Sequence, residues 1–291
     1  MISAVIPTVA GGERLSGYLD SITASLRAAA GVAWEVLVVS DGGGALPAMG
    51  ERIRVVVLED NRGYGPAVNA GARQASGDRL LVLNDDVRLE PSAVRLLSEA
   101  LAPGVFAVAP AILSPLARCG DEGGKAAVWR GGLIEIEEAP STRVHPTFYP
   151  VGCCFLCRTA TFLELGGYDE VLAPFFWEDV DLGFRARRRG LVTLHVPAAV
   201  CHHDGSATIG GRPLRDRQVT WHRNWALFQL RNLRERRLRA ANAGALAAQA
   251  LFGGPEVTDG LAAALRLYAV AGPRHEDGLS DGEILFRTGA S

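Results

Sequence analysis

The residues best suited to chemistry form a short acidic run, Asn84-Asp85-Asp86, directly after the apolar segment 79–83. We interpret that segment as a buried strand, which would hold the carboxylates at a rigid edge. Mg²⁺ and Mn²⁺ prefer sites built from one or two carboxylates, water and substrate phosphate oxygens. The run therefore predicts a divalent-cation site, and the alternative is that Asp and Asn merely form a turn.

Two other polar clusters also follow apolar segments. Asp41 comes after segment 35–39, and the Asn- and Gly-rich stretch 61–65 comes after segment 53–58. In an open parallel sheet, ligands bind beyond the carboxyl ends of the strands. Turn formation explains any single cluster, but three clusters at strand ends favour a ligand site.

A second acidic group spans Glu178 to Asp181 and directly follows the aromatic residues Phe175 to Trp177. Acids in the first turn of a helix stabilise it through the helix dipole, and this role needs no chemistry. The aromatic neighbours favour a catalytic role as well, because they would desolvate a carboxylate and raise its pKa toward that of a useful base. We therefore expect a general base in this segment.

His202 and His203 follow the strand-like segment 198–200. Imidazole is an ordinary ligand of divalent metals, although a surface pair of histidines is also commonplace. Cys154 and Cys157 superficially suggest a zinc knuckle, but their odd spacing in an apolar strand points the two side chains to opposite faces. A serine nucleophile lacks support because no G-x-S-x-G elbow occurs.

Strand and helix patterns alternate along the part of the chain that carries these residues. Apolar runs at 2–6, 35–39, 53–58, 79–83 and 105–108 predict strands, and helical periodicity at 15–26, 66–75 and after Pro91 predicts helices. This alternation predicts an α/β fold with a mostly parallel sheet covered by helices on both faces. Beyond Pro213 only helical patterns remain. A Rossmann G-x-G-x-x-G motif after the first strand and a P-loop are both missing.

The composition fits a globular protein: 291 residues, 48% hydrophobic and 21% charged, which suffices for a large core without disulfides. The net charge of −2 argues against a nucleic-acid-binding protein. Five cysteines, an odd number, follow an N-terminus without a secretory signal, and no apolar run reaches 18 residues. We expect a reduced, cytoplasmic protein without a membrane span.

The near-zero net charge conceals an arginine-rich segment, 182–239, with thirteen arginines against three acids. Arg185 to Arg189 are expected to form a solvated face near a helix C-terminus. Arg212 or Arg215 could instead bind a diphosphate through bidentate contacts. The helix over 221–239 carries its aromatic residues on one face, which would pack on the catalytic domain, on a second subunit or on an anionic membrane.

Together these motifs resemble those of family 2 glycosyltransferases, the inverting group with the GT-A fold, and especially its rhamnosyltransferase-like members. The resemblance runs from Ile2 to about Ser206. It rests on AVIPT, EVLVVSDG, NRGYGPAVNAGARQASGDRLLVLNDDV, FLELGGYDE and FFWEDVDLGFRARRRG. It implies a nucleotide-sugar donor, a divalent cation (Mg²⁺ or Mn²⁺), and direct displacement at the anomeric carbon with inversion.

The resemblance also implies which residues bind the donor. Asp41 matches the acid that accepts a hydrogen bond from the N–H of a pyrimidine base, and Pro7 and Thr8 line the same base. Gly65 and Asn69 match positions near the donor. Thymidine and uridine both carry that N–H, so dTDP- and UDP-sugars remain open as donors.

The metal site implied by the resemblance is the D-x-D position, occupied here by Asn84, Asp85 and Asp86. Asp86 matches the metal ligand, and Asn84 and Asp85 count among the donor-binding residues. His202 stands where many members place a further metal ligand in a V-x-H pattern, with His203 as the alternative.

The catalytic residues implied by the resemblance are Glu178 and Asp179, the family's E-D pair. Asp179 matches the general base that deprotonates the acceptor hydroxyl. The chain departs from the family where Val9-Ala10 replaces the usual Tyr-Asn, Ser40 replaces an acid and Gly43 replaces a serine. These departures are compatible with the glycosyltransferase class, but they leave the identity of the donor's nucleotide base undetermined.

We expect a GT-A catalytic domain over residues 1–214 and a C-terminal helical extension over 215–291. The acceptor would be a glycan, a lipid-linked or a small molecule. Contact with the inner face of the membrane and a homodimer through the C-terminal helices are further options. One alternative is a sugar-phosphate nucleotidyltransferase, whose Gly-rich G-x-G-x-R loop residues 11–14 resemble only weakly. The other is a non-catalytic nucleotide-sugar-binding module, which would lack Asp86 or Asp179.

Overall fold

The structure is a computed structural model that describes residues 1–9, 13–43, 46, 50–115, 120–205, 211–274 and 277–286. The stretch 10–12, which holds part of the departures noted above, lies outside the described residues. The strands are β1 (Ile2–Thr8), β2 (Trp34–Asp41), β3 (Ile53–Leu58), β4 (Arg79–Leu83), β5 (Val87–Leu89), β6 (Val105–Leu113), β7 (Lys125–Arg130), β8 (Leu133–Glu138), β9 (His145–Thr147), β10 (Cys154–Arg158) and β11 (Val192–His203). The helices are α1 (Glu13–Ala28), α2 (Tyr64–Gln74), α3 (Ala93–Ala100), α4 (Thr159–Glu164), the 3-10 helix η1 (Glu170–Leu172), α5 (Glu178–Arg188), α7 (Leu214–Asn232), α8 (Arg236–Phe252), α9 (Pro255–Ala271) and α10 (Asp281–Phe286).

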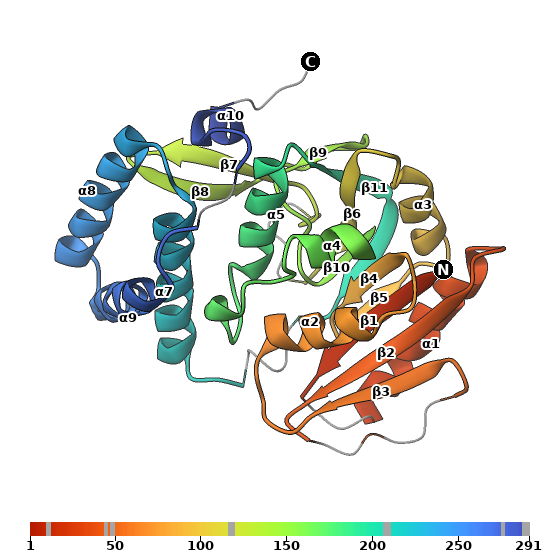
Figure 1. The fold of residues 1–291 in the computed structure, drawn as a ribbon. Helices are drawn as coiled ribbons and strands as arrows, with labels where there is room; N and C mark the ends of the chain where they lie inside the picture. The colour runs from red at the N-terminus through yellow and green to blue at the C-terminus, as the bar shows by residue number, and fades with distance from the viewer. Residues whose placement is uncertain are drawn as a thin grey trace.

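A large sheet of order β3-β2-β1-β4-β10-β6-β11-β5 forms the centre, and β9 pairs with β11 beside it (Figure 1). Strands β3, β2, β1 and β4 run parallel, as do β6 and β11, whereas β10 is antiparallel to both its neighbours. The predicted mostly parallel sheet is confirmed. The chain runs from β1 outward to β3 and then returns to place β4 on the other side of β1. The carboxyl ends of β1 and β4 therefore form the switch point at which such sheets bind ligands.

Helices cover both faces of this sheet, each over its own hydrophobic core. On one face α1 and α3 bury Leu19 and Val94, and on the other α2 and α4 bury Val68 and Phe162. Cys154 belongs to the first core and Cys157 to the second, so β10 points them to opposite faces as predicted. Both thiols are free, and they do not converge on one point.

A third core joins the C-terminal helices to the rest of the chain. It gathers Ile134 of β8, Phe184 of α5, Phe228 of α7, Leu246 of α8 and Leu261 of α9. Figure 1 shows α7 lying between α5 and the α8–α9 pair, with the β7–β8 hairpin above them. Of the alternatives left open by the sequence for this aromatic helix, packing on the catalytic part of the chain is what the structure contains. In the ranges given above, no helix is both long and apolar enough to span a membrane.

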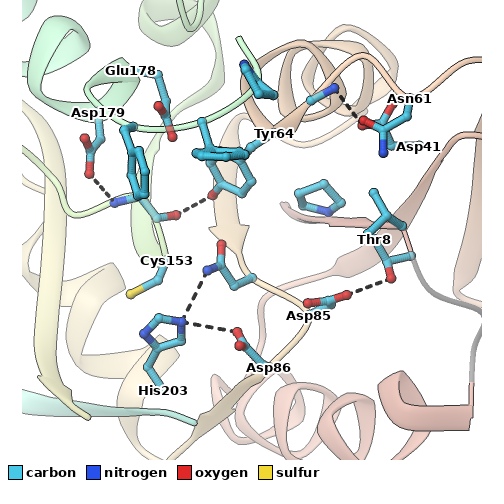
Figure 2. A pocket seen from close by; sticks show the side chains of 18 of the residues that line it. Thr8, Asp41, Asn61, Tyr64, Asp85, Asp86, Cys153, Glu178, Asp179 and His203 are labelled. Atoms are coloured by element: carbon cyan, nitrogen blue, oxygen red, sulfur yellow. Dashed lines mark hydrogen bonds and ion pairs between the residues drawn. The ribbon is translucent and has the colours of Figure 1, made fainter. Parts of the chain in front are cut away.

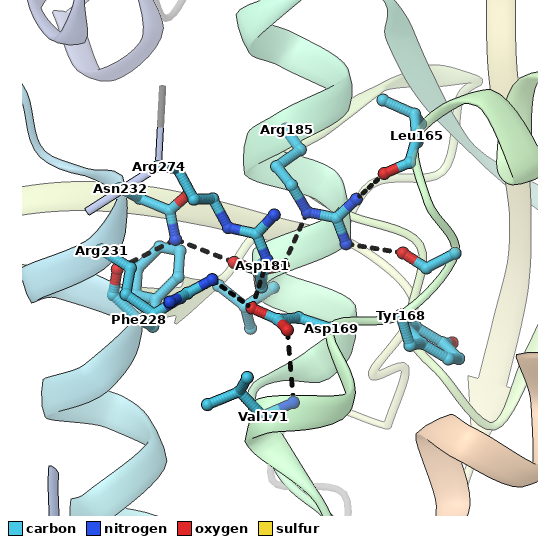
Figure 3. A network of polar contacts seen from close by, with 12 residues as sticks. Leu165, Tyr168, Asp169, Val171, Asp181, Arg185, Phe228, Arg231, Asn232 and Arg274 are labelled. Carbon is cyan, nitrogen blue, oxygen red and sulfur yellow. Dashed lines mark hydrogen bonds and ion pairs between the residues drawn. The ribbon is translucent and has the colours of Figure 1, made fainter. Parts of the chain in front are cut away.

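The expectation of a solvated arginine face at Arg185 to Arg189 is wrong for most of these residues. Arg185 is 2% exposed and donates to Asp181 Oδ2 (2.7 Å) and to the Leu165 and Gly167 carbonyl oxygens (Figure 3). Arg188 is equally buried and pairs with Asp281 at 2.5 Å. Of this run, only Arg189 has an exposed side chain. Helical spacing offers Asp181 as a partner of Arg185, but it cannot reveal the Leu165 and Gly167 carbonyl oxygens or Asp281, which lie in other segments.

Candidate active site

A pocket of about 360 Å³ opens at the carboxyl ends of β1, β2 and β4. Most of the residues expected to act in binding or catalysis line it, although they are far apart in the sequence. The pocket is lined by Pro7, Thr8, Val9, Asp41, Asn61, Gly63, Tyr64, Asn84, Asp85, Asp86, Val151, Gly152, Cys153, Pro174, Phe175, Phe176, Glu178, Asp179, His203 and Arg212. In Figure 2, Asp41 and Thr8 lie on one side, Glu178 and Asp179 on the opposite side, and Asp86 with His203 on a third.

A side-chain hydrogen bond connects the ends of β1 and β4 at the switch point. Thr8 Oγ1, at the end of β1, donates to Asp85 Oδ2 at 2.7 Å, directly after β4. Asp41, at the end of β2, is 4% exposed and accepts hydrogen bonds from the backbone N–H groups of Arg62 (2.7 Å) and Gly63 (2.8 Å). Asp41 thus fixes the loop before α2. Each of its oxygens retains a second lone pair that can accept a ligand N–H.

Asp86 and His203 form the potential metal-binding pair of the pocket. His203 Nε2 lies 3.2 Å from Asp86 Oδ1 and 3.3 Å from Asn84 Nδ2. His202, the residue preferred from the sequence, lies outside the pocket lining and contacts Glu90 Oε1 at 3.0 Å. Neighbouring residues of a strand point to opposite faces, so only one of two adjacent histidines on β11 can face Asp86. The geometry selects His203, which the sequence left as the alternative.

No group of three or more His, Cys, Asp or Glu side chains in the described ranges could by itself enclose a metal ion. The pair of Asp86 and His203 nevertheless fits a cation that takes its other ligands from water and from a bound phosphate. Asn84 supports this fit, since its Oδ1 is buried and has no hydrogen-bond partner in this part of the protein. The pocket has room for a cation that shares its ligands with a substrate.

The Glu178-Asp179 pair is presented by an unusual backbone segment, which we call the aromatic turn (residues 173–177). Phe176 and Trp177 have positive φ angles of 77° and 72°. Positive φ is sterically costly for bulky side chains and is found mainly where the surroundings impose it, often at functional sites. The α5 helix begins directly after this turn, at Glu178. The turn therefore sets where the two carboxyls point.

Burial raises the pKa of both carboxyls. For Glu178, desolvation and the nearby charge of Asp179 hold the pKa well above its usual value. Its Oε2 atom is buried and has no hydrogen-bond partner within the described structure. For Asp179, desolvation raises the pKa, opposed by hydrogen bonds from the Gly152 N–H (3.0 Å) and the Val180 N–H (2.8 Å). The desolvation predicted from the aromatic residues is confirmed, and the pair suits a proton acceptor beside a protonated acid.

The lining residues carry many negative charges and few positive ones. Five of those named above are Asp or Glu, and Arg212 is the one Lys or Arg among them. The Arg212 guanidinium lies 5.4 Å from the centre of the Phe175 ring. Arg215, the other candidate for a diphosphate contact, pairs instead with Asp259 on α9. An anionic ligand in this pocket therefore needs a cation besides Arg212.

Comparison with known proteins identifies this architecture. The sequence model of glycosyl transferase family 2 matches residues 3–164, more than half of the chain. The chain belongs to glycosyltransferase family 2. The matched range includes β1 to β4 and the acidic run after β4. The remainder of the pocket, from the aromatic turn to His203 and Arg212, follows it in the sequence.

Curated relatives of this glycosyltransferase come from several bacteria. An N-acetylglucosaminyl-diphospho-decaprenol L-rhamnosyltransferase of Mycobacterium tuberculosis is 29% identical over 259 residues, which cover 77% of this chain and 83% of the relative. The O-antigen biosynthesis protein RfbC of Myxococcus xanthus is 29% identical over 71% of this chain and 17% of its own length.

Solved structures establish the fold of the glycosyltransferase as GT-A. GalNAc-T7, solved with UDP, GalNAc and Mn²⁺, superposes with a TM-score of 0.67 at 16% identity, covering 99% of this chain and 56% of that one. The Staphylococcus aureus TarS fragment 1–349 gives 0.52 at 16% identity, covering 94% and 81%. The mannosyltransferase PcManGT of Pyrobaculum calidifontis, solved with GDP-Man and Mn²⁺, gives 0.51 at 15% identity, covering 92% and 80%.

Two residues expected near the donor do not line the pocket of the glycosyltransferase. Gly65 packs against Tyr168, where an added Cβ would lie 3.2 Å from the Tyr168 Cβ. Asn69 is 3% exposed and uses its amide to bind the Tyr168 backbone, accepting from its N–H at 2.8 Å and donating to its carbonyl at 2.9 Å. Both residues hold α2 against the segment after α4, so their contribution to the site is indirect.

Other pocket residues of the glycosyltransferase escaped the sequence reasoning. Tyr64 lines the pocket and its hydroxyl donates to the Gly152 carbonyl, while the Gly152 N–H donates to Asp179. Gly63, beside it, has φ 93°, and an added Cβ would lie 2.5 Å from the Pro174 Cα. The glycines of Gly63-Tyr64-Gly65 are the sequence feature that could have revealed this contact, because glycine permits the close approach of this backbone to the aromatic turn.

Proposed function

We propose that this glycosyltransferase moves a sugar from a nucleoside-diphosphate donor, a dTDP- or UDP-sugar, to an acceptor hydroxyl by direct displacement with inversion. The observation that carries the proposal is the arrangement of acids in one pocket: Asp41 at one side, Asp86 with His203 at another, and Asp179 opposite Asp41. A donor spanning these points would bring its anomeric carbon between the diphosphate and the carboxylate that receives the acceptor proton.

On the donor side, Asp41, Pro7 and Thr8 would bind the nucleotide base. The carboxyl oxygens of Asp41 can accept the N–H that thymine and uracil share, beside the two backbone N–H groups that they already hold. Asp86 and His203 would hold Mg²⁺ or Mn²⁺, which when bound neutralises charge on the departing diphosphate. Two fold neighbours, GalNAc-T7 and PcManGT, are solved with Mn²⁺, which supports a divalent cation at this site. Arg212 lines the same pocket and would reach the diphosphate from the other direction.

On the acceptor side, Asp179 would take the proton of the attacking hydroxyl, on the face of the sugar opposite to the leaving group. The Gly152 N–H orients its Oδ2 atom. Glu178 would stay protonated beside it, because burial and the Asp179 charge both raise the Glu178 pKa. With one acid neutral and the other ionised, a single carboxylate serves as the base. No covalent sugar–enzyme intermediate is required.

For the acceptor, the M. tuberculosis relative offers a guide through its name, which describes an N-acetylglucosaminyl-diphospho-decaprenol acceptor. We extend to this chain the class of a glycan, lipid-linked or small-molecule hydroxyl. We also retain as proposals the boundary near residue 214 and contact of the C-terminal helices with a membrane surface or a second copy. Exposed Leu251 and Phe252 at the end of α8 would serve such a contact.

The experiment that tests the proposal is a transfer and hydrolysis assay with dTDP-L-rhamnose and UDP-hexoses in the presence of Mn²⁺ or Mg²⁺. Release of the nucleoside diphosphate, dependent on the cation and lost in excess chelator, supports it. Full activity in chelator removes Asp86 and His203 from their proposed roles. Release of pyrophosphate from a nucleoside triphosphate plus a sugar phosphate would identify a nucleotidyltransferase instead. Binding of nucleoside diphosphate without any donor turnover would identify a non-catalytic binding module.

A further inference from the structure

The aromatic turn is held by a side chain from the C-terminal helices. Asn224, on α7, is completely buried, and its Nδ2 atom donates to the carbonyl oxygens of Leu172 (2.5 Å), Phe175 (2.9 Å) and Phe176 (2.9 Å). The two hydrogens of one amide group are thus shared among three carbonyl oxygens at the two ends of the segment 172–176. Buried carbonyls without a partner are destabilising, so the loss of this amide would be felt throughout the turn.

The orientation of Asn224 is itself determined by its neighbour. The Nε atom of Arg223 donates to Asn224 Oδ1 at 2.8 Å, which leaves Nδ2 directed toward the turn. The Arg223 guanidinium also donates to the Ala173 carbonyl oxygen. Two consecutive residues of α7 therefore bind the turn from Leu172 to Phe176, on the side away from the β-strands that supply Asp41 and Asp86.

The conformation that is held in this way is a costly one. Bulky residues at positive φ are sterically strained, and they persist only where surrounding contacts determine the backbone. Phe176 and Trp177 both have positive φ, and the next two residues are Glu178 and Asp179. The contacts of Asn224 reach the carbonyl oxygen of Phe175, the residue before the strained pair, and that of Phe176, the first strained residue.

We infer that Asn224 is a positioning residue for the reaction, acting with Arg223 to hold the aromatic turn and thereby the direction and desolvation of Asp179. The inference rests on the proposed function of Asp179 as the base. It assigns to the C-terminal helices a part in building the acceptor side of the pocket. A change at Asn224 acts on proton removal from the acceptor and leaves the nucleotide side, built on β1, β2 and β4, as it was.

The chain contains a matched control for this inference. Asn242, on α8, is also buried (2% exposed), and its Nδ2 donates to the Gly132 carbonyl (2.9 Å) and to Gln229 Oε1 (2.8 Å). It lies in the same set of C-terminal helices but contacts neither the turn nor the pocket lining. Asn224→Ala and Asn242→Ala therefore remove chemically equal groups at equal burial.

The test compares both variants with wild type in two measurements. Hydrogen exchange of the backbone N–H groups at 175–179 should accelerate in Asn224→Ala and stay unchanged in Asn242→Ala. The transfer rate at saturating donor should fall about 10- to 100-fold in Asn224→Ala, whereas the Kd for UDP or dTDP should change by less than about twofold. The acid limb of the pH–rate profile should move to lower pH, because a loosened turn readmits water to Asp179.

Equal effects of the two variants on exchange and rate would overturn the inference, since they would indicate only a general loss of stability. If Asn224→Ala does not fold, Arg223→Lys provides the second variant: it retains a cation but loses the Nε donor to Asn224, and it should show the same pattern at smaller amplitude. An unchanged exchange pattern and rate in the variant that folds also overturns it. If wild type transfers no sugar, the proposed function fails, while the exchange measurement still decides whether Asn224 holds the turn.

Discussion

The two sides of the pocket are built by different means. The donor side is made of residues that directly follow β1, β2 and β4, so each side chain is placed by a parallel strand and its neighbours. At the sheet edge Thr8 donates to Asp85, and Asp41 accepts from the Arg62 N–H of the loop before α2. The sheet alone therefore positions the side chains on this side of the pocket.

The acceptor side, in contrast, is made of a strained turn that depends on distant segments. Its backbone is contacted by Asn224 from α7 and by the N–H of Tyr64, the first residue of α2, which donates to the Pro174 carbonyl at 2.8 Å. Trp177 packs on Phe228 of α7, with ring centres 5.3 Å apart. The C-terminal helices are thus part of the wall that carries Glu178 and Asp179.

The difference suggests how variation would be distributed between the two sides. We expect the strand ends to keep a common donor site even where the sequence of the C-terminal helices varies. A change in α7 acts first on the turn, and we expect it to affect the proposed base and the acceptor wall more than the nucleotide side. The family match over residues 3–164 covers the strand ends that carry Thr8, Asp41 and Asp86, and it stops before the turn.

The largest expected effect on the comparison comes from Asp179→Asn. Loss of the proposed base should reduce sugar transfer by about 10²- to 10⁴-fold, the usual contribution of general base catalysis, with the Kd for UDP or dTDP nearly unchanged. Initial rates and nucleotide titrations measure the two quantities. Glu178→Gln is the matched control, since it replaces a carboxyl that is already protonated and should retain most of the transfer. Near-normal turnover in Asp179→Asn would remove it as the base.

A second prediction concerns whether the acceptor wall and the C-terminal helices unfold together. Asp281 is completely buried and binds Arg188 of α5 and the N–H groups of Arg234 and Glu235. Asp281→Ala leaves the Arg188 charge buried without its partner, which typically costs about 3–5 kcal/mol of the free energy of unfolding. Differential scanning calorimetry should give one transition at lower temperature. Two separate transitions, with only one shifted, would mean that the helices form an independent unit.

The third prediction separates the two histidines on the donor side. His203→Ala should weaken binding of UDP or dTDP in the presence of Mn²⁺ by about 10- to 100-fold, the usual effect of losing a group next to a metal. His202→Ala removes the same ring from the opposite face of β11, and titration calorimetry should find binding within about twofold of wild type. A loss in His202→Ala with none in His203→Ala would restore the assignment made from the sequence.

Much of the donor side could be predicted from the sequence, because it depends on local patterns. Apolar runs followed by Asp41 and by Asn84 to Asp86 reveal both the strands and the edge they share. The same reasoning preferred His202, whereas the structure places His203 beside Asp86 and His202 beside Glu90. Pairing register is not readable from an isolated apolar run.

For the acceptor side, the sequence predicted the type of residue but not the backbone conformation and contacts that hold it. The aromatic residues before Glu178 correctly indicate desolvated carboxyls, yet nothing in the local sequence reveals positive φ at Phe176 or a contact from Asn224, 48 residues away. Arg185 and Arg188 were misread for the same reason. Besides Asp181 on α5 itself, their acceptors lie in the loop after α4 and in α10, so only the tertiary structure shows that this basic helix end is buried.

The smallest expected effect is on pH dependence, and it distinguishes the two acids of the acceptor side. Because burial raises the pKa of Asp179, the base is lost as pH falls through a value above the usual range of an aspartate, and the transfer rate should fall with it. For stability the sign is opposite. A carboxyl with a raised pKa in the folded state favours folding below its unfolded pKa, and this contribution is lost as pH rises through the folded pKa.

Glu178, whose pKa is raised furthest of the two, should therefore make the wild-type enzyme less stable as pH rises through that raised pKa. Glu178→Gln removes the titration and keeps the shape, so the melting temperature of the variant should depend less on pH while the acid limb of the rate profile, set by Asp179, is retained. Melting curves and rates across the same pH series measure both. If the variant instead loses the acid limb, Glu178 is the base, and the two carboxyls exchange their roles.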